Sequence, residues 1–189
     1  MTDRSDIGLT REEAFRLVLE KIGHTNLLKH ILAVEAEMRR LAERLGEDVG
    51  LWGLTGLLHD LDYNETVGDA GAHTFVTESW LQPYHLPAAM LYAIRAHPGH
   101  VPCRSRLDWA LFATDPATGF IVACVLMHPA KRLDVIDADF MLRRFKEKRF
   151  AAGASRDNMA ACTSLGLELE EFLLLVHAGM MTIRSDLQL

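Results

Sequence analysis

The residues best suited to chemistry in this 189-residue chain are histidines and aspartates spread over its first two thirds. Imidazole nitrogens and carboxylate oxygens together suit divalent first-row metal ions, and carboxylates favour the harder ions. An adjacent His-Asp pair is useful at such a site, because neighbouring helix residues project about 100° apart and can surround one ion. An aspartate has two oxygens and can also bridge a second ion. The residues concerned are His30, His59, Asp60, His73, His97 and Asp115.

Each of these residues also has an ordinary structural explanation when it is taken alone. A histidine on an apolar helix face is usually a hydrogen-bonded core residue, and this explanation suits His30 and His59. Asp115 precedes Pro116 and could cap a helix that begins at the proline. The other three could lie at helix ends, where imidazoles and carboxylates interact with the helix dipole: Asp60, His73 and His97.

Other common sources of activity are absent from the sequence. It contains no Gly-rich phosphate loop, no Gly-x-Ser-x-Gly, no His-Glu-x-x-His and no Cys-x-x-Cys motif. The three cysteines are odd in number and far apart, which indicates reduced thiols of a cytoplasmic protein. The net charge of −6 argues against binding nucleic acid over the whole surface. Uncharged stretches are at most 16 residues long (79–94), so we expect no membrane-spanning helix.

Helical periodicity predicts the elements that must position the histidines and aspartates. Thr10-Arg-Glu-Glu13 is a capping box, and the helix that it starts should end near Gly23. A second, amphipathic helix should begin at Thr25 or Asn26 and end at Gly46. A third, apolar nearly all round, should cover 48–60, followed by a loop at 64–71. Further helices are expected at 73–82, 87–96, 105–115, 138–149, 156–165 and 168–181, and the apolar run 120–127 is interpreted as helix rather than strand.

The whole pattern predicts an all-α protein. No strand-turn-strand alternation, internal repeat or low-complexity linker is visible, and the composition is 49% hydrophobic and 24% charged, as in globular proteins. A chain of this length can bury roughly two thirds of its unfolded surface, which is enough for a core without disulfides. We therefore expect a single domain over residues 1–189, with its helices packed around the third.

The six residues, taken in order, resemble the pattern of the HD superfamily of metal-dependent phosphohydrolases. The local sequences match as well, because an apolar run leads into Leu57-Leu-His-Asp-Leu-Asp62. The turn Ala113-Thr-Asp-Pro-Ala-Thr-Gly119 is typical of small bacterial HD-domain proteins. The segment 130–180, with Phe-Lys-x-Lys-x-Phe at 145–150, resembles the same subgroup. The resemblance implies a helical bundle with a metal-ligand core at about 25–128 and C-terminal helices at 137–183 packed on it.

The resemblance also implies ligand roles for one or two divalent metal ions, with Fe, Mn, Ni, Zn, Co and Mg all open. The ligands of the first ion would be His30, His59, Asp60 and Asp115. Those of the second would be Asp60, as the bridge, with His73 and His97. The sequence departs from the cyclic-dinucleotide phosphodiesterases of the family, because it lacks their Gly-Tyr-Pro signature. It also lacks the Glu that follows His-Asp in the small nucleotidases, whereas dinucleoside-polyphosphate hydrolases carry similar intermediate histidines.

The expected function is hydrolysis of a phosphate ester or anhydride by metal-activated water, with a nucleotide or dinucleotide as the small-molecule substrate. Asp60 would orient or bridge, and Asp62 or His97 would move a proton. Nucleic acid and membranes are not expected partners, and a homo-oligomer stays open. Two alternatives remain: a regulatory module that binds metal and nucleotide without turnover, and a di-iron oxygenase-type HD enzyme. The cations expected at the substrate phosphate are Arg95, Arg104, Lys131 and Lys146.

Overall fold

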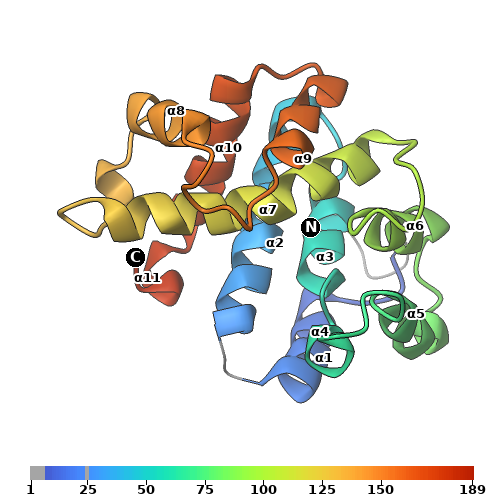
Figure 1. Cartoon of the computed structure of the whole chain (residues 1–189). Coiled ribbons are helices and arrows are strands. Elements are labelled where there is room, and N and C mark those ends of the chain that lie inside the picture. Colours follow the sequence, from blue (N-terminus) through green and yellow to red (C-terminus); the bar gives the residue numbers. More distant parts are fainter. Residues whose placement is uncertain (1–6, 24–25) are drawn as a thin grey trace.

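The computed structural model describes residues 7–23 and 26–189, and no strand occurs among them (Figure 1). The predicted all-α fold is confirmed. Its α-helices are α1 (Arg11–Ile22), α2 (Asn26–Leu45), α3 (Val49–Leu58), α4 (Tyr63–Thr66), α5 (Phe75–Leu81), α6 (Ala88–Ala96), α7 (Arg106–Met127), α8 (Ala138–Lys146), α9 (Arg156–Ala160), α10 (Leu169–Thr182) and α11 (Arg184–Leu187). Short 3-10 segments are η1 (Gln82–Tyr84), η2 (Leu133–Val135) and η3 (Ala161–Leu165).

Local signals set several helix ends as predicted. The Thr10 hydroxyl accepts a hydrogen bond from the Glu13 backbone N–H, and the Glu13 carboxylate accepts one from the Thr10 N–H. Asp48 caps α3 by accepting from the Leu51 N–H at 2.9 Å. Helix α1 ends before Gly23, which has a φ of 70°. Thr25, the alternative start of the second helix, lies outside the described residues.

The predicted loop at 64–71 is partly wrong, because the short helix α4 occupies its first residues. Helices were also expected separately at 105–115 and 120–127, and the structure joins them into the single helix α7. Pro116 removes one helical hydrogen bond inside α7, at a cost of about 3 kcal/mol. Leu111, Phe120 and Ile121 are fully buried on the two sides of the proline. Because each contributes about 1.5–3 kcal/mol on burial, packing outweighs the local break.

The helices pack around α2 and α7, and not around the third helix alone. Helix α2 lies against α3, α7 and α10, while α7 also contacts α6 and α9 (Figure 1). One apolar core surrounds α7 and includes Phe120 and Phe172. A smaller core between α1, α3 and α6 includes Leu57 and Leu58. The seam between these two cores, along α2, is where the histidines and aspartates gather.

Helix α7 is the one helix in the described part of the chain that is long and apolar enough to cross a membrane. It did not stand out in the sequence, because Asp108 and Asp115 interrupt the apolar run. More than half of the apolar stretch is buried inside the protein. Its composition therefore matches that of the central helix of the larger core.

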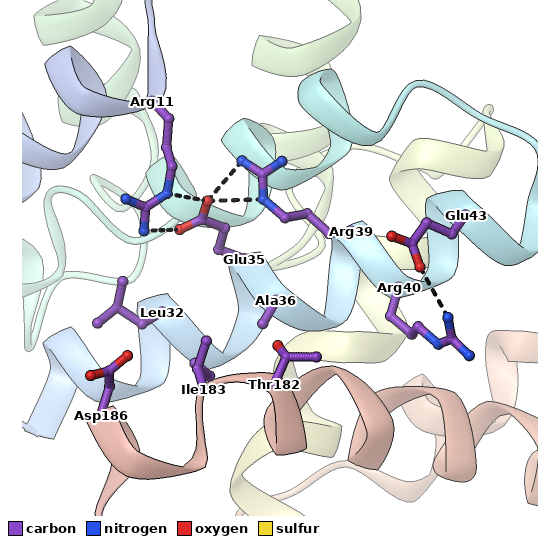
Figure 2. A pocket seen from close by; sticks show the side chains of 10 residues that line it. All are labelled: Arg11, Leu32, Glu35, Ala36, Arg39, Arg40, Glu43, Thr182, Ile183 and Asp186. Carbon is purple, nitrogen blue, oxygen red and sulfur yellow. Dashed lines mark hydrogen bonds and ion pairs between the residues drawn. The ribbon is translucent and has the colours of Figure 1, made fainter. Parts of the chain in front are cut away.

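Helix α1 is held on α2 by an ionic cluster on the opposite side of α2 from α7. The nearly buried Glu35 carboxylate accepts hydrogen bonds from Arg11 at 2.8 and 3.0 Å and from Arg39 at 2.8 and 3.0 Å (Figure 2). A buried carboxylate needs such pairing to offset its lost hydration. The three side chains line a cavity of about 260 Å³. Because the Glu35 carboxylate pairs with both arginines and joins α1 to α2, we assign the cluster to holding the fold together.

Gly56 allows α2 and α3 to approach each other closely. A Cβ atom at this position would lie 2.9 Å from the Val34 carbonyl oxygen and 3.1 Å from the Glu35 Cα atom. We expect Gly56→Ala to lower the free energy of unfolding by about 1–3 kcal/mol, because the backbone of α2 must move. Urea denaturation measures this change. Gly153→Ala is the control, since its Cβ meets nothing within 4 Å, and equal stability of the two variants would contradict the prediction.

Candidate metal centre

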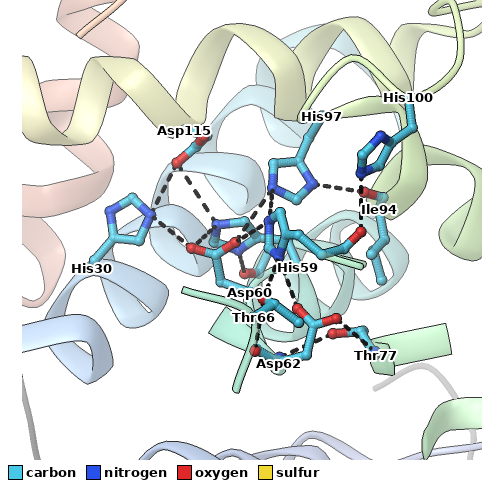
Figure 3. Close-up of polar contacts among 12 residues, drawn as sticks. His30, His59, Asp60, Asp62, Thr66, Thr77, Ile94, His97, His100 and Asp115 are labelled. Atoms are coloured by element: carbon cyan, nitrogen blue, oxygen red, sulfur yellow. Dashed lines mark hydrogen bonds and ion pairs between the residues drawn. The ribbon is translucent and has the colours of Figure 1, made fainter. Parts of the chain in front are cut away.

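All six histidines and aspartates singled out in the sequence meet at one place, although they come from five segments. Figure 3 labels five of them: His30, His59, Asp60, His97 and Asp115. His59 and Asp60 follow the end of α3, and His97 follows the end of α6. His73 lies in the turn before α5. The remaining two lie within helices: His30 near the start of α2 and Asp115 near the middle of α7. Asp115 is therefore inside a helix, so the alternative of a capping residue is wrong.

Asp60 lies at the centre of the group and is nearly buried. Its Oδ1 atom is 3.3 Å from the Nε2 atom of His73 and 3.3 Å from that of His97. Its Oδ2 atom is 3.5 Å from the Nε2 atom of His59 and 3.9 Å from that of His30. The two oxygens thus serve two different pairs of histidines. Three ligand atoms on each side lie within 4.8 Å of one another, which is close enough to surround one ion on each side.

Asp115 completes the side formed by His30 and His59. Its Oδ1 atom is 3.0 Å from the Nε2 atom of His30 and 3.8 Å from that of His59. The side chains of His30 and Asp115 are 23% and 32% exposed, whereas that of His59 is fully buried. The centre is therefore closed at His59 and open toward solvent along the edge formed by His30 and Asp115.

Three of the histidines are fixed by a hydrogen bond from the ring nitrogen that faces away from the centre. Nδ1 of His59 donates to the Gly56 carbonyl at 2.7 Å, and Nδ1 of His97 donates to the Ile94 carbonyl at 2.6 Å. Nδ1 of His73 donates to Asp62 at 2.8 Å. Such outer partners fix the tautomer and orientation of metal-binding histidines and leave Nε2 for the metal.

The buried Nε2 atom of His59 is the clearest sign that these residues fit a metal ion. Within the described residues it has no hydrogen-bond partner, although it is excluded from solvent. A buried polar atom without a partner costs free energy and needs an explanation. A divalent ion held between His59, Asp60 and Asp115 would bind that nitrogen and balance both carboxylates. The four imidazoles and two carboxylates suit first-row transition metals.

In the metal-free centre, histidines and carboxylates lie close together and shift each other's pKa values. Burial by itself would lower the pKa of His59, but the carboxylates of Asp60 and Asp115 raise it to about 9. His73 is raised to about 9 in the same way, against burial, by Asp60 and Asp62. Burial would raise the pKa values of Asp60 and Asp115, but the neighbouring histidines hold both well below their usual range. In the absence of metal, protons bound to the histidines thus balance the negative charge of the carboxylates.

We expect the metal-free protein to lose stability as the pH rises from about 6.5 to about 9. The pKa values of His59 and His73 are higher in the folded chain than the ordinary 6.5 of an unfolded chain. Their protonation therefore stabilises the fold fully below pH 6.5, and this contribution is lost as the pH passes the folded value. Thermal unfolding in a chelator at pH 6.5, 7.5 and 9 measures the trend. A melting temperature that rises over this range would contradict it.

Asp62 lies behind His73, and the proton-transfer role that the sequence analysis gave it stays a prediction. It is fully buried, its Oδ1 atom accepts from His73, and its Oδ2 atom accepts from the backbone N–H of Thr77 at 2.9 Å. The Thr77 hydroxyl accepts in turn from the Asp62 N–H at 3.0 Å. Both carboxylate oxygens are thus engaged behind His73, away from the open edge. Asp62 is a positioning residue that orients His73.

We expect Asp62→Asn to reduce metal-dependent activity about 10–100-fold, which is the usual effect of losing an outer partner of a ligand. The neutral amide would hold the His73 ring less firmly and make its Nε2 a weaker ligand. The affinity for the second ion should fall as well, while the helical circular dichroism stays unchanged. Asp157→Asn, on an exposed position of α9, is the matched control. Full activity and affinity in Asp62→Asn would contradict this role.

The four cations expected at the substrate phosphate are not gathered at the centre. Arg95 is paired with Glu78, and Arg104 lies over the ring of Tyr92 at 5.0 Å. Lys131 follows the end of α7, which lies about 18 Å along the helix axis from Asp115. None of these three, nor Lys146 on α8, forms an ion pair with the six clustered residues in the described part of the chain. Their role in phosphate binding therefore stays a prediction.

Glu37 is a buried polar residue near the centre that the sequence analysis did not identify. It is fully buried, its Oε2 atom accepts from the Thr118 hydroxyl at 2.6 Å, and burial raises its pKa well above the ordinary range. It lies seven residues after His30, so the two share one face of α2. The seven-residue spacing could have indicated that Glu37 lies near the centre, but a glutamate in a helix is usually exposed.

Comparison with known proteins agrees with this arrangement. Residues 27–116 match the HD domain family, and this range contains all six clustered residues. The chain is 31% identical over 137 residues to Ribonuclease Y of Desulfotalea psychrophila (strain LSv54 / DSM 12343), an alignment that covers 70% of this chain and 26% of that protein. The chain thus spans about a quarter of the length of this relative. No solved structure gives a significant match. The family match supports an HD domain at residues 27–116 of the chain, and proteins with this domain are mostly metal-dependent hydrolases.

Proposed function

We propose that this protein is a metal-dependent phosphohydrolase that cleaves a phosphate ester or anhydride bond of a nucleotide or dinucleotide. The observation that carries the proposal is the central position of Asp60, with one oxygen toward His73 and His97 and the other toward His30 and His59. A carboxylate shared by two sets of imidazoles matches the ligand order of a two-metal hydrolase. A small-molecule substrate and a cytoplasmic location are parts of the same proposal.

Some residues of the centre are held rigidly in place, and others form its open edge. A divalent ion bound here lowers the pKa of water and stabilises negative charge on phosphoryl oxygens. His59 and His97 are tied to backbone carbonyls, so their Nε2 atoms are held rigidly. His30 and Asp115 form the exposed edge, from which a phosphate group can reach the centre. The closed side at His59 excludes water from behind the ligands.

The relative found by comparison supports including phosphodiesters among the substrates. It is named a ribonuclease, and a ribonuclease cleaves phosphodiester bonds between nucleotides. The net charge of −6 does not favour a long nucleic acid on this chain, so a nucleotide or dinucleotide is the smaller substrate that satisfies both observations. We therefore place phosphodiesters first among the substrates to be tested.

The test is an activity screen of protein that has been stripped of metal and reloaded with one metal at a time. The metals are Mn, Fe, Co, Ni, Zn and Mg, and the first substrate is bis(p-nitrophenyl) phosphate, followed by nucleotides and dinucleotides. We expect release of p-nitrophenol from the first substrate, and of phosphate or nucleotide from the others, with at least one metal. Tight binding of metal and nucleotide without release would favour the regulatory module. Oxygen-dependent turnover of the iron form without hydrolysis would favour the oxygenase-type enzyme.

A further inference from the structure

A cavity of about 420 Å³ opens beside the metal centre, between α2, α7, α10 and the C-terminal residues 187–189. His30 lines this cavity and also belongs to the six clustered residues. The cavity therefore begins at the exposed edge of the centre, on the side from which a substrate phosphate must enter. It is separate from the cavity beside Glu35 on the other side of α2.

The lining of the cavity continues the helix faces that carry the metal ligands. On α7, Gly119, Val122 and Leu126 follow Asp115 by 4, 7 and 11 residues, which places all four on one face of the helix. Successive positions lead away from Asp115 by about 6 Å at Gly119 and about 16 Å at Leu126 along the helix axis. A molecule with its phosphate at the centre can thus extend along α7 into the cavity.

Gly119 keeps this path free of a side chain. It lies inside α7, and a Cβ atom there would meet nothing within 4 Å, so packing does not require a glycine. A glycine inside a helix costs about 1 kcal/mol relative to alanine. Gly56 in α3, by contrast, is required by the close approach of α2. The open space above Gly119 is therefore space that a bound molecule can occupy.

The chemistry of the lining suits a mostly apolar group with polar edges. Val122, Leu126 and Met180 form apolar walls, and Leu126 is 57% exposed although it is apolar. Asn26 and Gln188 provide side-chain amides at the border of the cavity, where the Gln188 Oε1 atom accepts from Lys29 at 2.7 Å. Apolar walls with a few placed amide groups are the usual surroundings of a small organic ligand. A nucleobase meets both requirements, since it has apolar faces and hydrogen-bonding edges.

We infer that this cavity binds the nucleoside part of a substrate whose phosphate lies at the metal centre. The inference rests on the proposed function for the position of the phosphate, and Gly119 is its specificity-determining residue. A larger side chain at position 119 would fill the space between the metal centre and the apolar walls. It would thereby exclude the nucleoside, while the six clustered residues themselves are unchanged.

Two phosphodiesters with the same leaving group test the inference on metal-loaded protein: methyl p-nitrophenyl phosphate and thymidine 5′-(p-nitrophenyl phosphate). We expect kcat/KM to be at least about 10-fold higher for the thymidine ester, because a single buried methylene is already worth about that factor. Gly119→Leu should reduce this preference to less than about 2-fold. Gly153→Leu is the control and should keep the preference, since its position is also free of close neighbours but does not line the cavity.

Thymidine itself provides a readout that does not depend on catalysis, because it has no phosphate to hydrolyse. Calorimetric titration of the metal-loaded protein should detect thymidine binding, and Gly119→Leu should weaken this binding at least about 10-fold. Equal kcat/KM for the two esters in the unmodified protein would overturn the inference, as would unchanged thymidine binding in Gly119→Leu. If neither ester is hydrolysed with any metal, the proposed function fails, while thymidine binding that Gly119→Leu removes still supports the cavity assignment.

Discussion

Asp60→Asn is expected to reduce phosphohydrolase activity by at least about 100-fold and to lower the metal content of the purified protein. The substitution keeps the size of the side chain but removes its charge and one strong acceptor oxygen. Both oxygens of Asp60 are in use, one toward His73 and His97 and the other toward His30 and His59. Losing even an outer partner of a metal ligand costs about 10–100-fold, so losing the shared ligand should cost more.

The fold should survive this substitution, because Leu57 and Leu58 anchor the end of α3 in the smaller core. Circular dichroism and elemental analysis on Asp60→Asn separate loss of metal from loss of structure. Asp157→Asn, an exposed carboxylate of α9, serves again as the matched control. A soluble, helical Asp60→Asn protein with full metal content and unchanged activity would remove Asp60 from the centre.

Removing the metal with a chelator is expected to reduce hydrolysis at least about 1,000-fold, because a bound metal supplies several kcal/mol of transition-state stabilisation. Returning the metal should restore the activity, since the apolar cores do not depend on the ion. Titration of the stripped protein should saturate at two ions per chain. The two groups of ligand atoms that share Asp60 predict this number.

His97→Ala tests whether the first ion still binds when the site of the second is lost. The variant should bind one ion per chain, because His30, His59 and Asp115 remain while the second group loses one of its three ligands. Elemental analysis of the unmodified protein and of the variant gives the two stoichiometries. Saturation of the unmodified protein at one ion, with no change in His97→Ala, would favour a single-metal centre. Activity that persists after complete metal removal would end the hydrolase proposal.

The fold could be predicted from the sequence wherever a local signal decided the structure. The capping box at Thr10 and the cap at Asp48 fix helix starts through hydrogen bonds between near neighbours in sequence. The single helix α7 could not be predicted, because Pro116 argues locally for a break. What overrides it is the burial of residues such as Phe120 against parts of the chain that are distant in sequence.

In the candidate site, too, some features could be predicted from the sequence and others could not. The six clustered residues could be identified from their order, since that order resembles a known family. The engaged position of Asp62 could not, because its partner Thr77 lies 15 residues away and meets it only in the folded chain. Glu37 was missed because burial of a glutamate depends on α7 and α10 packing over α2. Sequence patterns thus name the chemical groups, while tertiary contacts decide which of them bind metal and which support the others.

Because five separate segments supply the clustered residues, the centre is complete only in the folded chain. His30 and Asp115 are 85 positions apart, and the core helix α7 must be docked on α2 before they meet. An incompletely folded chain therefore offers only fragments of the site, and the ion binds the native state selectively. A free metal concentration 100 times the dissociation constant would then add about 2.7 kcal/mol to the stability. In a cell, retention of metal would report that a newly synthesised molecule has completed its folding.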